Sequence, residues 1–262
     1  MSVGVEVIAE AQSKARLGAW RWSLSLAMAA GAAFVIFPDL DLWISRAVYS
    51  PATGFLGARV SWLAAVRAGF IVFYFGCAAL SLAGLIGAAM GRARGFSRKQ
   101  WLFLVVCLGV GPGLLANLTF KDQWGRARPK QVAAFGGDKL FTPALLPTKQ
   151  CRKNCSFVSG EAASVFVAFY AAAAVVPQWT ATLVVVGTAA GLTAGAVRIV
   201  QGAHFASDVI FAGLLMALAV FALSLLMLGG TSASVIGLRG LWLRQTSQLK
   251  QLWRQGTPTE AS

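Results

Sequence analysis

Residues 196–209, AVRIVQGAHFASDV, hold the only histidine of the chain. Asp208 follows His204 by four residues, and Arg198 precedes it by six. On a helix beginning here, His204 and Asp208 share a face. The carboxylate can then accept a hydrogen bond from the N–H group of one ring nitrogen and leave the other ring nitrogen free as a nucleophile. A guanidinium fork such as that of Arg198 can bind two oxygens of a phosphoryl group. The alternative is a buried histidine satisfied by a neighbouring aspartate, beside an unrelated arginine.

A second cluster, KDQWGRARP, places Lys121 and Arg128 seven residues apart, immediately before Pro129. Seven residues are about two helical turns, so on a helix both cations point toward one site, and the proline then ends that helix. The pair is therefore a candidate anion-binding site.

A third cluster, CSFVSGEAAS, puts Ser159, Gly160 and Glu161 at the start of an apolar block. At a helix N-terminus, the free backbone N–H groups and the helix dipole favour an anion. Ser159 can equally be an ordinary helix cap. A carboxylate as close to hydrocarbon as Glu161 is costly and usually has a partner or a function.

The composition indicates an integral membrane protein. Hydrophobic residues make up 57% of the 262 residues and only nine residues are acidic; the mean hydropathy is +0.68. The apolar residues come in long blocks rather than on alternating faces. The basic residues behind the net charge of +14 lie between these blocks, which favours membrane orientation and anionic lipid over nucleic acid as their purpose.

The apolar blocks predict an all-α fold with six transmembrane helices in a single domain. The predicted spans are residues 22–37, 62–90, 101–120, 158–176, 180–200 and 208–228. The core then covers residues 22–228, and a basic tail follows at 229–262. Residues 38–60 suit a short amphipathic connection at the membrane interface.

Basic residues at two flanks set the predicted orientation. Lys14, Arg16 and Arg21 precede the first span, and the loop GRARGFSRKQ at residues 91–100 has four basic residues and no acidic one. The positive-inside rule places both flanks, and hence both termini, in the cytoplasm. Residues 121–157 then lie outside, although their eight basic and two acidic residues give a net charge of +6. An anionic partner outside would explain this charge; the alternative is that long loops translocate whatever their charge.

In chain order, the clusters are Lys, six residues, Arg-Pro; then Ser-Gly; then Arg, five residues, His, three residues, Asp. This ordered set, over about residues 121–208, resembles the signature of the type 2 phosphatidic acid phosphatase superfamily. Within that superfamily, the PDLDLWIS and CSFVSGE stretches are most similar to bacterial lipid A phosphatases. The resemblance implies an enzyme of the bacterial inner membrane, with its active site at the periplasmic ends of the helices.

The resemblance also implies a role for each matched residue. His204 would be the nucleophile that forms a phosphohistidine, and Asp208 would orient it. The residues that would hold the phosphoryl oxygens are Lys121, Arg128, Ser159, Gly160 and Arg198. No cofactor and no metal is implied, and the sequence has no clustered carboxylates or further histidines from which to build a metal site.

The sequence departs from the superfamily pattern at three positions. Val158 stands where the signature usually has proline, and Val197 where it usually has serine. Glu161 stands where the family usually has the histidine that protonates the leaving oxygen. A carboxyl group could do this if burial kept it protonated, although nearby cations oppose that. Our hypothesis is that Glu161 is the general acid or a ligand of the leaving group.

Cysteine placement adds a further expectation. Cys151 and Cys155 lie in the outer segment, where an oxidising compartment permits a disulfide, and their separation is feasible in a turn without establishing the bond. Cys77 and Cys107 fall within predicted spans and suit a role as small apolar residues.

The sequence therefore predicts a metal-independent phosphatase whose partner is an anionic membrane lipid, with lipid A preferred. Alternative substrates are a polyprenyl diphosphate, phosphatidylglycerol phosphate or phosphatidic acid. A phosphotransferase would use the same His204, and a non-catalytic lipid-binding or transport protein is the alternative from a different class. The oligomeric state stays open, because Gly187 and Gly191 permit close helix packing within one chain or between chains.

Overall fold

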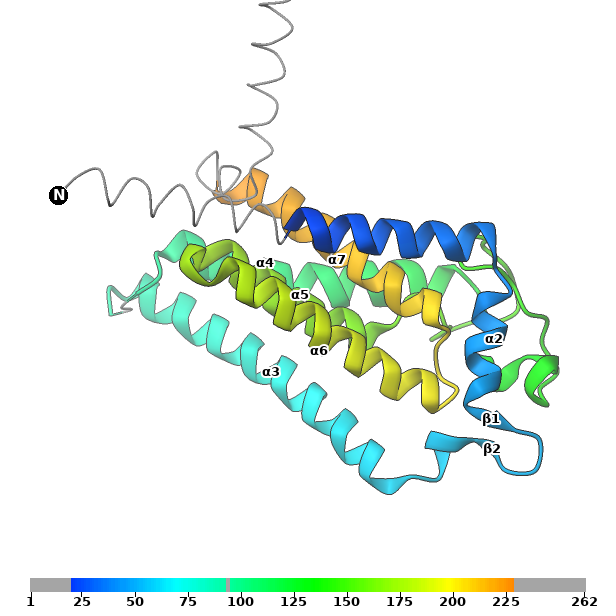
Figure 1. Cartoon of the computed structure of the whole chain (residues 1–262). Helices are drawn as coiled ribbons and strands as arrows, with labels where there is room; N and C mark the ends of the chain where they lie inside the picture. The colour runs from blue at the N-terminus through cyan, green and yellow to red at the C-terminus, as the bar shows by residue number, and fades with distance from the viewer. Residues whose placement is uncertain (1–19, 93–94, 229–262) are drawn as a thin grey trace, which may run out of the picture.

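Helices make up most of the described chain, which is residues 20–92 and 95–228 of the computed structural model (Figure 1). The predicted basic flank at Lys14 and Arg16 and the basic tail 229–262 lie outside the described residues. The longer helical elements are Trp20–Ile36, α3 (Ser61–Ala89), α4 (Arg98–Leu108) with its π-helical continuation η2 (Gly109–Lys121), α5 (Gly160–Val175), α6 (Thr180–Val200) and α7 (Ala206–Leu228). The shorter elements are α2 (Leu40–Ala47), the antiparallel strands β1 (Tyr49–Ser50) and β2 (Gly54–Phe55), and the 3₁₀ turns η1 (Leu56–Ala58), η3 (Pro129–Gln131), η4 (Ala133–Phe135) and η5 (Pro177–Trp179).

Each apolar block of the sequence forms a helix, and the mostly helical fold is confirmed. The four helices long and apolar enough to cross a bilayer are Ser61–Ala89, Arg98–Lys121, Pro177–Val200 and Ala206–Leu228. A fifth candidate is Trp20–Ile36 together with α2, a pair bent by 100°. Since α5 has 16 residues, it is shorter than the roughly 20 that a span usually needs. The described residues therefore give four candidate spans, or five with the bent pair, and a sixth span stays a prediction.

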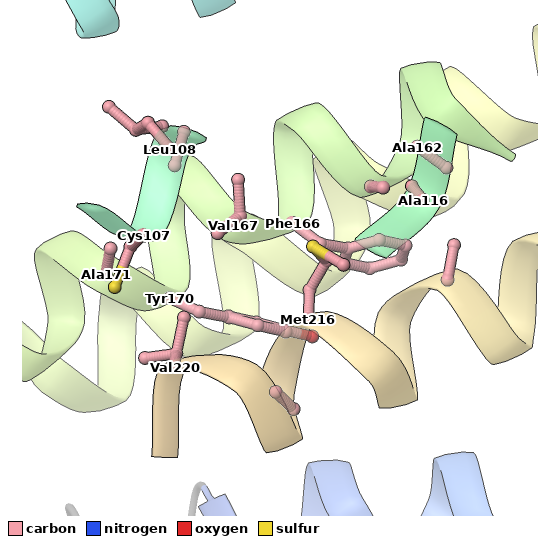
Figure 2. Close-up of a cluster of buried hydrophobic side chains, with 14 of the residues drawn as sticks. Cys107, Leu108, Ala116, Ala162, Phe166, Val167, Tyr170, Ala171, Met216 and Val220 are labelled. Carbon is pink, nitrogen blue, oxygen red and sulfur yellow. The ribbon is translucent and has the colours of Figure 1, made fainter. Parts of the chain in front are cut away.

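The helix α5 lies at the centre of the bundle, between α4, α6 and α7. Figure 2 shows Phe166 and Tyr170 of α5 packed beside Met216 of α7, with Cys107 of α4 in the same buried cluster. The close approach of α6 depends on small residues, because a Cβ atom on Gly187 would lie 2.3 Å from the Cβ atom of Phe169 in α5. This glycine therefore serves packing within the chain.

The connection at residues 38–60 contains α2, which lies across the end of the bundle where α6 ends and α7 begins (Figure 1). Its amphipathic pattern is the reverse of that of a helix on a soluble core. Asp41 is 1% exposed, whereas Trp43 is 72% exposed. The prediction of an amphipathic connection agrees with this helix, but its polar face is the buried one.

The predicted helix joining Lys121 to Arg128 is wrong, because the chain turns at Gly125. This glycine has a φ angle of +71°, and a Cβ atom there would lie 1.7 Å from the carbonyl oxygen of Thr148. Only glycine tolerates both the left-handed conformation and this approach. The returning chain is held by backbone hydrogen bonds from Thr148 to Trp124 and from Cys155 to Lys121.

Replacing Gly187 with alanine should destabilise the protein by about 1–3 kcal/mol, the usual cost of forcing extra volume into a packed core. The measurement is thermal unfolding of the purified protein in detergent. Gly69→Ala in α3 is the matched control, because a Cβ atom on Gly69 meets nothing within 4 Å. Equal midpoints for the two variants would contradict the packing described for α5 and α6.

Candidate active site

The three polar clusters meet at the end of the bundle that α2 covers. Arg198 lies near the end of α6, and His204 stands two residues before α7 begins. Glu161 in the first turn of α5 joins them, because its carboxylate is 3.4 Å from Arg198 Nε and 3.8 Å from His204 Nε2. The end of η2 adds Lys121, whose ammonium group would be 2.7 Å from a Cβ atom on Gly160. Residues far apart in the sequence therefore form one charged site.

The imidazole of His204 is fully buried and has one ring nitrogen free of hydrogen bonds. Its Nδ1 atom is 2.7 Å from the carbonyl oxygen of Ser156. A carbonyl oxygen only accepts hydrogen bonds, so Nδ1 carries the proton, and Nε2 of the neutral ring keeps its lone pair. This lone pair is directed to the side of the ring where Glu161 lies.

The contact between Asp208 and His204 differs from the direct hydrogen bond expected of a shared helical face. Nδ1 is 3.6 Å from Asp208 Oδ2, farther than from Ser156. The Asp208 carboxylate instead accepts hydrogen bonds from the Ser156 hydroxyl at 2.5 Å and from the Phe205 backbone N–H at 2.8 Å. Through these hydrogen bonds, Asp208 holds Ser156 and Phe205 in place next to the imidazole. It also supplies a negative charge near the ring.

Arg126, which the sequence analysis did not single out, is fully buried behind this histidine. Its guanidinium donates hydrogen bonds to Asp208 at 2.6 Å, to the Ser207 hydroxyl at 2.9 Å and to the Thr142 carbonyl at 2.9 Å. It also lies 4.4 Å from the ring centroid of Phe205. Burial alone would lower the pKa of Arg126, but the neighbouring carboxylates outweigh burial and raise that pKa above its ordinary value. The side chain is therefore a buried, permanently charged support.

Asp41 of α2 completes this support. One carboxylate oxygen accepts a hydrogen bond from Arg126 at 2.8 Å. The other accepts the backbone N–H of Ser207, in the first turn of α7, at 2.9 Å. The buried face of α2 is therefore explained by a carboxylate that shares Arg126 with Asp208 and caps an N–H group of α7.

Glu161 lies between cations from different helices. Arg67 of α3, another residue that the sequence analysis missed, donates two hydrogen bonds to Glu161 Oε1, at 3.1 Å and 3.0 Å. Arg198 approaches the same oxygen through Nε. A protonated Glu161 would have to give up both ion pairs, so its resting form is a carboxylate paired with two guanidinium groups.

Ser159 and Gly160 form the start of α5 as the sequence predicted. The Ser159 backbone N–H donates to the Asp208 carbonyl at 3.1 Å. Its buried hydroxyl has no hydrogen-bond partner among the described residues, and it does not cap the helix. This hydroxyl is therefore available to a ligand, and the lack of a side chain at Gly160 leaves room for the Lys121 ammonium group.

Arg128 lies at the rim of the site, bound to Asn154 in the loop between η2 and α5. Its guanidinium donates to the backbone carbonyl of Asn154 at 2.8 Å and to the Asn154 side chain at 2.8 Å. A disulfide joins Cys151 to Cys155 around that asparagine. Burial lowers the pKa of Arg128, while the charges of Glu161 and Asp208 oppose this shift.

A cavity of about 360 Å³ opens from the charged site along α3, η2 and α5. Lys121 and Glu161 line its polar end. Its other lining residues are Phe70, Ile71, Tyr74, Phe75, Pro112, Gly113, Asn117, Gly160 and Ser164. Within residues 20–92 and 95–228, no group of three or more His, Cys, Asp or Glu side chains is arranged to hold a metal ion.

Residues 100–231 match the PAP2 superfamily, and the chain belongs to this superfamily. It is 36% identical over 190 residues to the lipid A 4'-phosphatase of Francisella tularensis subsp. novicida (strain U112), covering 69% of this chain and 83% of that protein. It is 31% identical over 218 residues to the lipid A 4'-phosphatase of Rhizobium leguminosarum, covering 78% of this chain and 91% of that protein. No solved structure matches the chain.

Replacing Asp41 with alanine should destabilise the protein by about 1–3 kcal/mol, because Arg126 keeps Asp208 as its partner but the buried N–H and hydroxyl groups of Ser207 lose their acceptor. Turnover should fall as well, since the start of α7 loses its anchor beside His204. Both effects are measured by thermal unfolding and by phosphate release. Asp39→Ala is the matched control, because Asp39 is exposed and makes no side-chain cap bond. If Asp41→Ala were as stable and as active as Asp39→Ala, Asp41 would not support Arg126 and the start of α7 as described.

Proposed function

We propose that this protein is a lipid phosphatase that removes a phosphate monoester from lipid A through a phosphohistidine on His204, without a metal ion. The observation that carries the proposal is the buried Nε2 atom of His204, which has no hydrogen-bond partner among the described residues and lies 3.8 Å from Glu161, the carboxylate that Arg67 and Arg198 bind. Membership of the PAP2 superfamily and the names of the relatives support the reaction and the substrate.

The reaction takes place in two displacements at phosphorus. The Nε2 lone pair attacks phosphorus, the bond to the ester oxygen breaks, and its electron pair leaves with that oxygen, which takes up a proton that comes from solvent, directly or by way of Glu161. Water then attacks the phosphohistidine and gives up a proton to solvent, the phosphorus–nitrogen bond breaks, and its electron pair returns to Nε2. During the first step the ring becomes positively charged, and Asp208, 3.6 Å from Nδ1, stabilises this charge.

The phosphoryl oxygens are held by cations and by hydrogen-bond donors that the fold leaves unused. Arg198 and Lys121 supply charge next to Glu161, and the Ser159 hydroxyl and the Gly160 backbone N–H supply donors at the start of α5. Arg128 contributes from the rim, where Asn154 fixes its guanidinium. Fixed donors of this kind stabilise the charge that redistributes in the transition state.

The lipid lies with its phosphate among these residues and its chains toward the apolar part of the cavity beside α3. We place this end of the bundle in the periplasm of a bacterium, with six spans across the inner membrane and both termini in the cytoplasm. The net charge of +6 in residues 121–157 suits an anionic lipid surface. The disulfide between Cys151 and Cys155 suits an oxidising compartment.

The decisive experiment measures phosphate release from lipid A, a polyprenyl diphosphate, phosphatidylglycerol phosphate and phosphatidic acid by the purified protein with a chelator present. We expect release from lipid A by the native protein. His204→Ala should abolish both turnover and the covalent phosphoenzyme, because His204 is the only histidine in the sequence. Release from the other lipids alone would change the substrate, and activity retained without His204 would remove the mechanism. Transfer of the phosphoryl group to a second lipid in place of water would identify a phosphotransferase.

Glu161→Gln tests the role of the residue that replaces the usual histidine. If Glu161 protonates or binds the leaving oxygen, the glutamine variant should turn over lipid A about 10²–10⁴-fold more slowly, the usual contribution of a general acid. The same variant keeps the side-chain shape, and thermal unfolding checks its fold. Turnover equal to that of the native protein would exclude this role for Glu161.

A further inference from the structure

Arg67 is the only charged residue of α3, the helix that runs along the outside of the bundle (Figure 1). A guanidinium group on an apolar, membrane-spanning helix is costly unless it has a partner or a function. Its partner is Glu161, 94 residues away in sequence, and the Arg67 side chain remains 42% exposed. Arg67 also lies before residues 100–231, so it is no part of the superfamily match.

The Glu161 carboxylate lies between two guanidinium groups and the imidazole of His204. Its Oε1 atom lies between the guanidinium groups of Arg67 and Arg198, at 3.0 Å and 3.4 Å. Its Oε2 atom is 3.8 Å from the unbonded Nε2 of His204. One oxygen of this carboxylate therefore contacts two guanidinium groups, and the other lies near the nucleophile. Two oxygens of a bound phosphate would need the same arrangement.

We propose that Arg67 is an additional substrate-binding residue, which exchanges Glu161 for the phosphate of the incoming lipid. Glu161 fills the phosphate position in the empty site. The phosphate then displaces it and binds Arg67 and Arg198. The released carboxylate, no longer ion-paired, takes up a proton from solvent and passes it to the leaving oxygen. The inference rests on the proposed function of the same site.

The charge of the phosphate and the exposure of Arg67 favour this exchange. A phosphate monoester carries close to two negative charges at neutral pH, against one on Glu161. A guanidinium fork matches two phosphate oxygens as well as it matches a carboxylate. Arg67 is exposed enough to follow the phosphate, and it lies three residues before Phe70, which lines the lipid cavity. The α3 helix therefore contributes a cation to the phosphate site and a wall to the cavity next to it.

The test measures the Kd of the purified full-length protein for inorganic phosphate, by phosphorus NMR titration in detergent. The proteins are the native chain, Glu161→Gln, and Glu161→Gln combined with Arg67→Gln, Arg67→Lys or Arg46→Gln. Arg46 is exposed on α2 and serves as the control for the loss of one positive charge. Because Glu161→Gln already breaks the ion pair, any further effect of Arg67 comes from its contact with phosphate.

We expect Glu161→Gln to bind phosphate roughly tenfold or more tightly than the native chain, since the competing carboxylate charge is gone. Adding Arg67→Gln to the Glu161→Gln protein should weaken phosphate binding by roughly tenfold or more, because one charge-assisted hydrogen bond is lost. Arg67→Lys should recover part of this affinity, and Arg46→Gln should leave it unchanged. Equal affinity with and without Arg67, or no phosphate binding by Glu161→Gln, would overturn the inference.

These results are separable from those on the proposed function. If no lipid loses phosphate to the native protein but Arg67 changes the affinity for phosphate, the anion exchange stands and the phosphatase assignment fails. If lipid A is hydrolysed but Arg67 has no effect on phosphate affinity in the Glu161→Gln protein, the phosphatase stands and the exchange fails.

Discussion

The buried guanidinium of Arg126 is the interaction on which the rest of the site depends. It joins α2, through Asp41, to the start of α7, through Asp208, and it extends from the loop between η2 and α5. A buried charge is tolerated only when it is paired and hydrogen-bonded, and here two carboxylates meet that requirement. Asp208 in turn binds Ser156, whose carbonyl oxygen sets the tautomer of His204. The free Nε2 atom is thus a consequence of a chain of buried polar contacts that begins at α2.

Much of the fold and part of the site could be predicted from local patterns in the sequence. Apolar blocks marked every long helix, because burial in lipid or in the bundle requires continuous hydrophobicity. The ordered signature residues His204 and Arg198 were identified because their spacing is local. Their placement beside Glu161 agrees with the prediction of a common site. The number of spans could not be settled in the same way, since composition does not distinguish the short central helix α5 from one that crosses the bilayer.

The residues that sequence reasoning missed are those with distant partners. Asp41 and Arg126 are 85 residues apart, and each is an ordinary charge in a polar segment until the fold brings them together. The signal that could have found Asp41 is its spacing of four residues from Ser45, which puts both on one polar face of α2. Arg67 had a clearer signal, a lone charge inside a long apolar block. The predicted helix from Lys121 to Arg128 was wrong for the opposite reason, because a local turn at Gly125 overrode a periodicity argument.

Under the proposed exchange at Arg67, a glutamate in place of the usual histidine also affects which lipids can enter the site. Glu161 balances cations that would otherwise be uncompensated beside hydrocarbon. Most phosphate groups on a membrane surface are diesters with a single negative charge, which is no more than Glu161 already provides. A monoester with close to two charges competes better for Arg67 and Arg198. An internal carboxylate in the phosphate position would therefore reject the abundant diesters by charge and admit the terminal monoester, a selectivity that a neutral histidine at this position would not give.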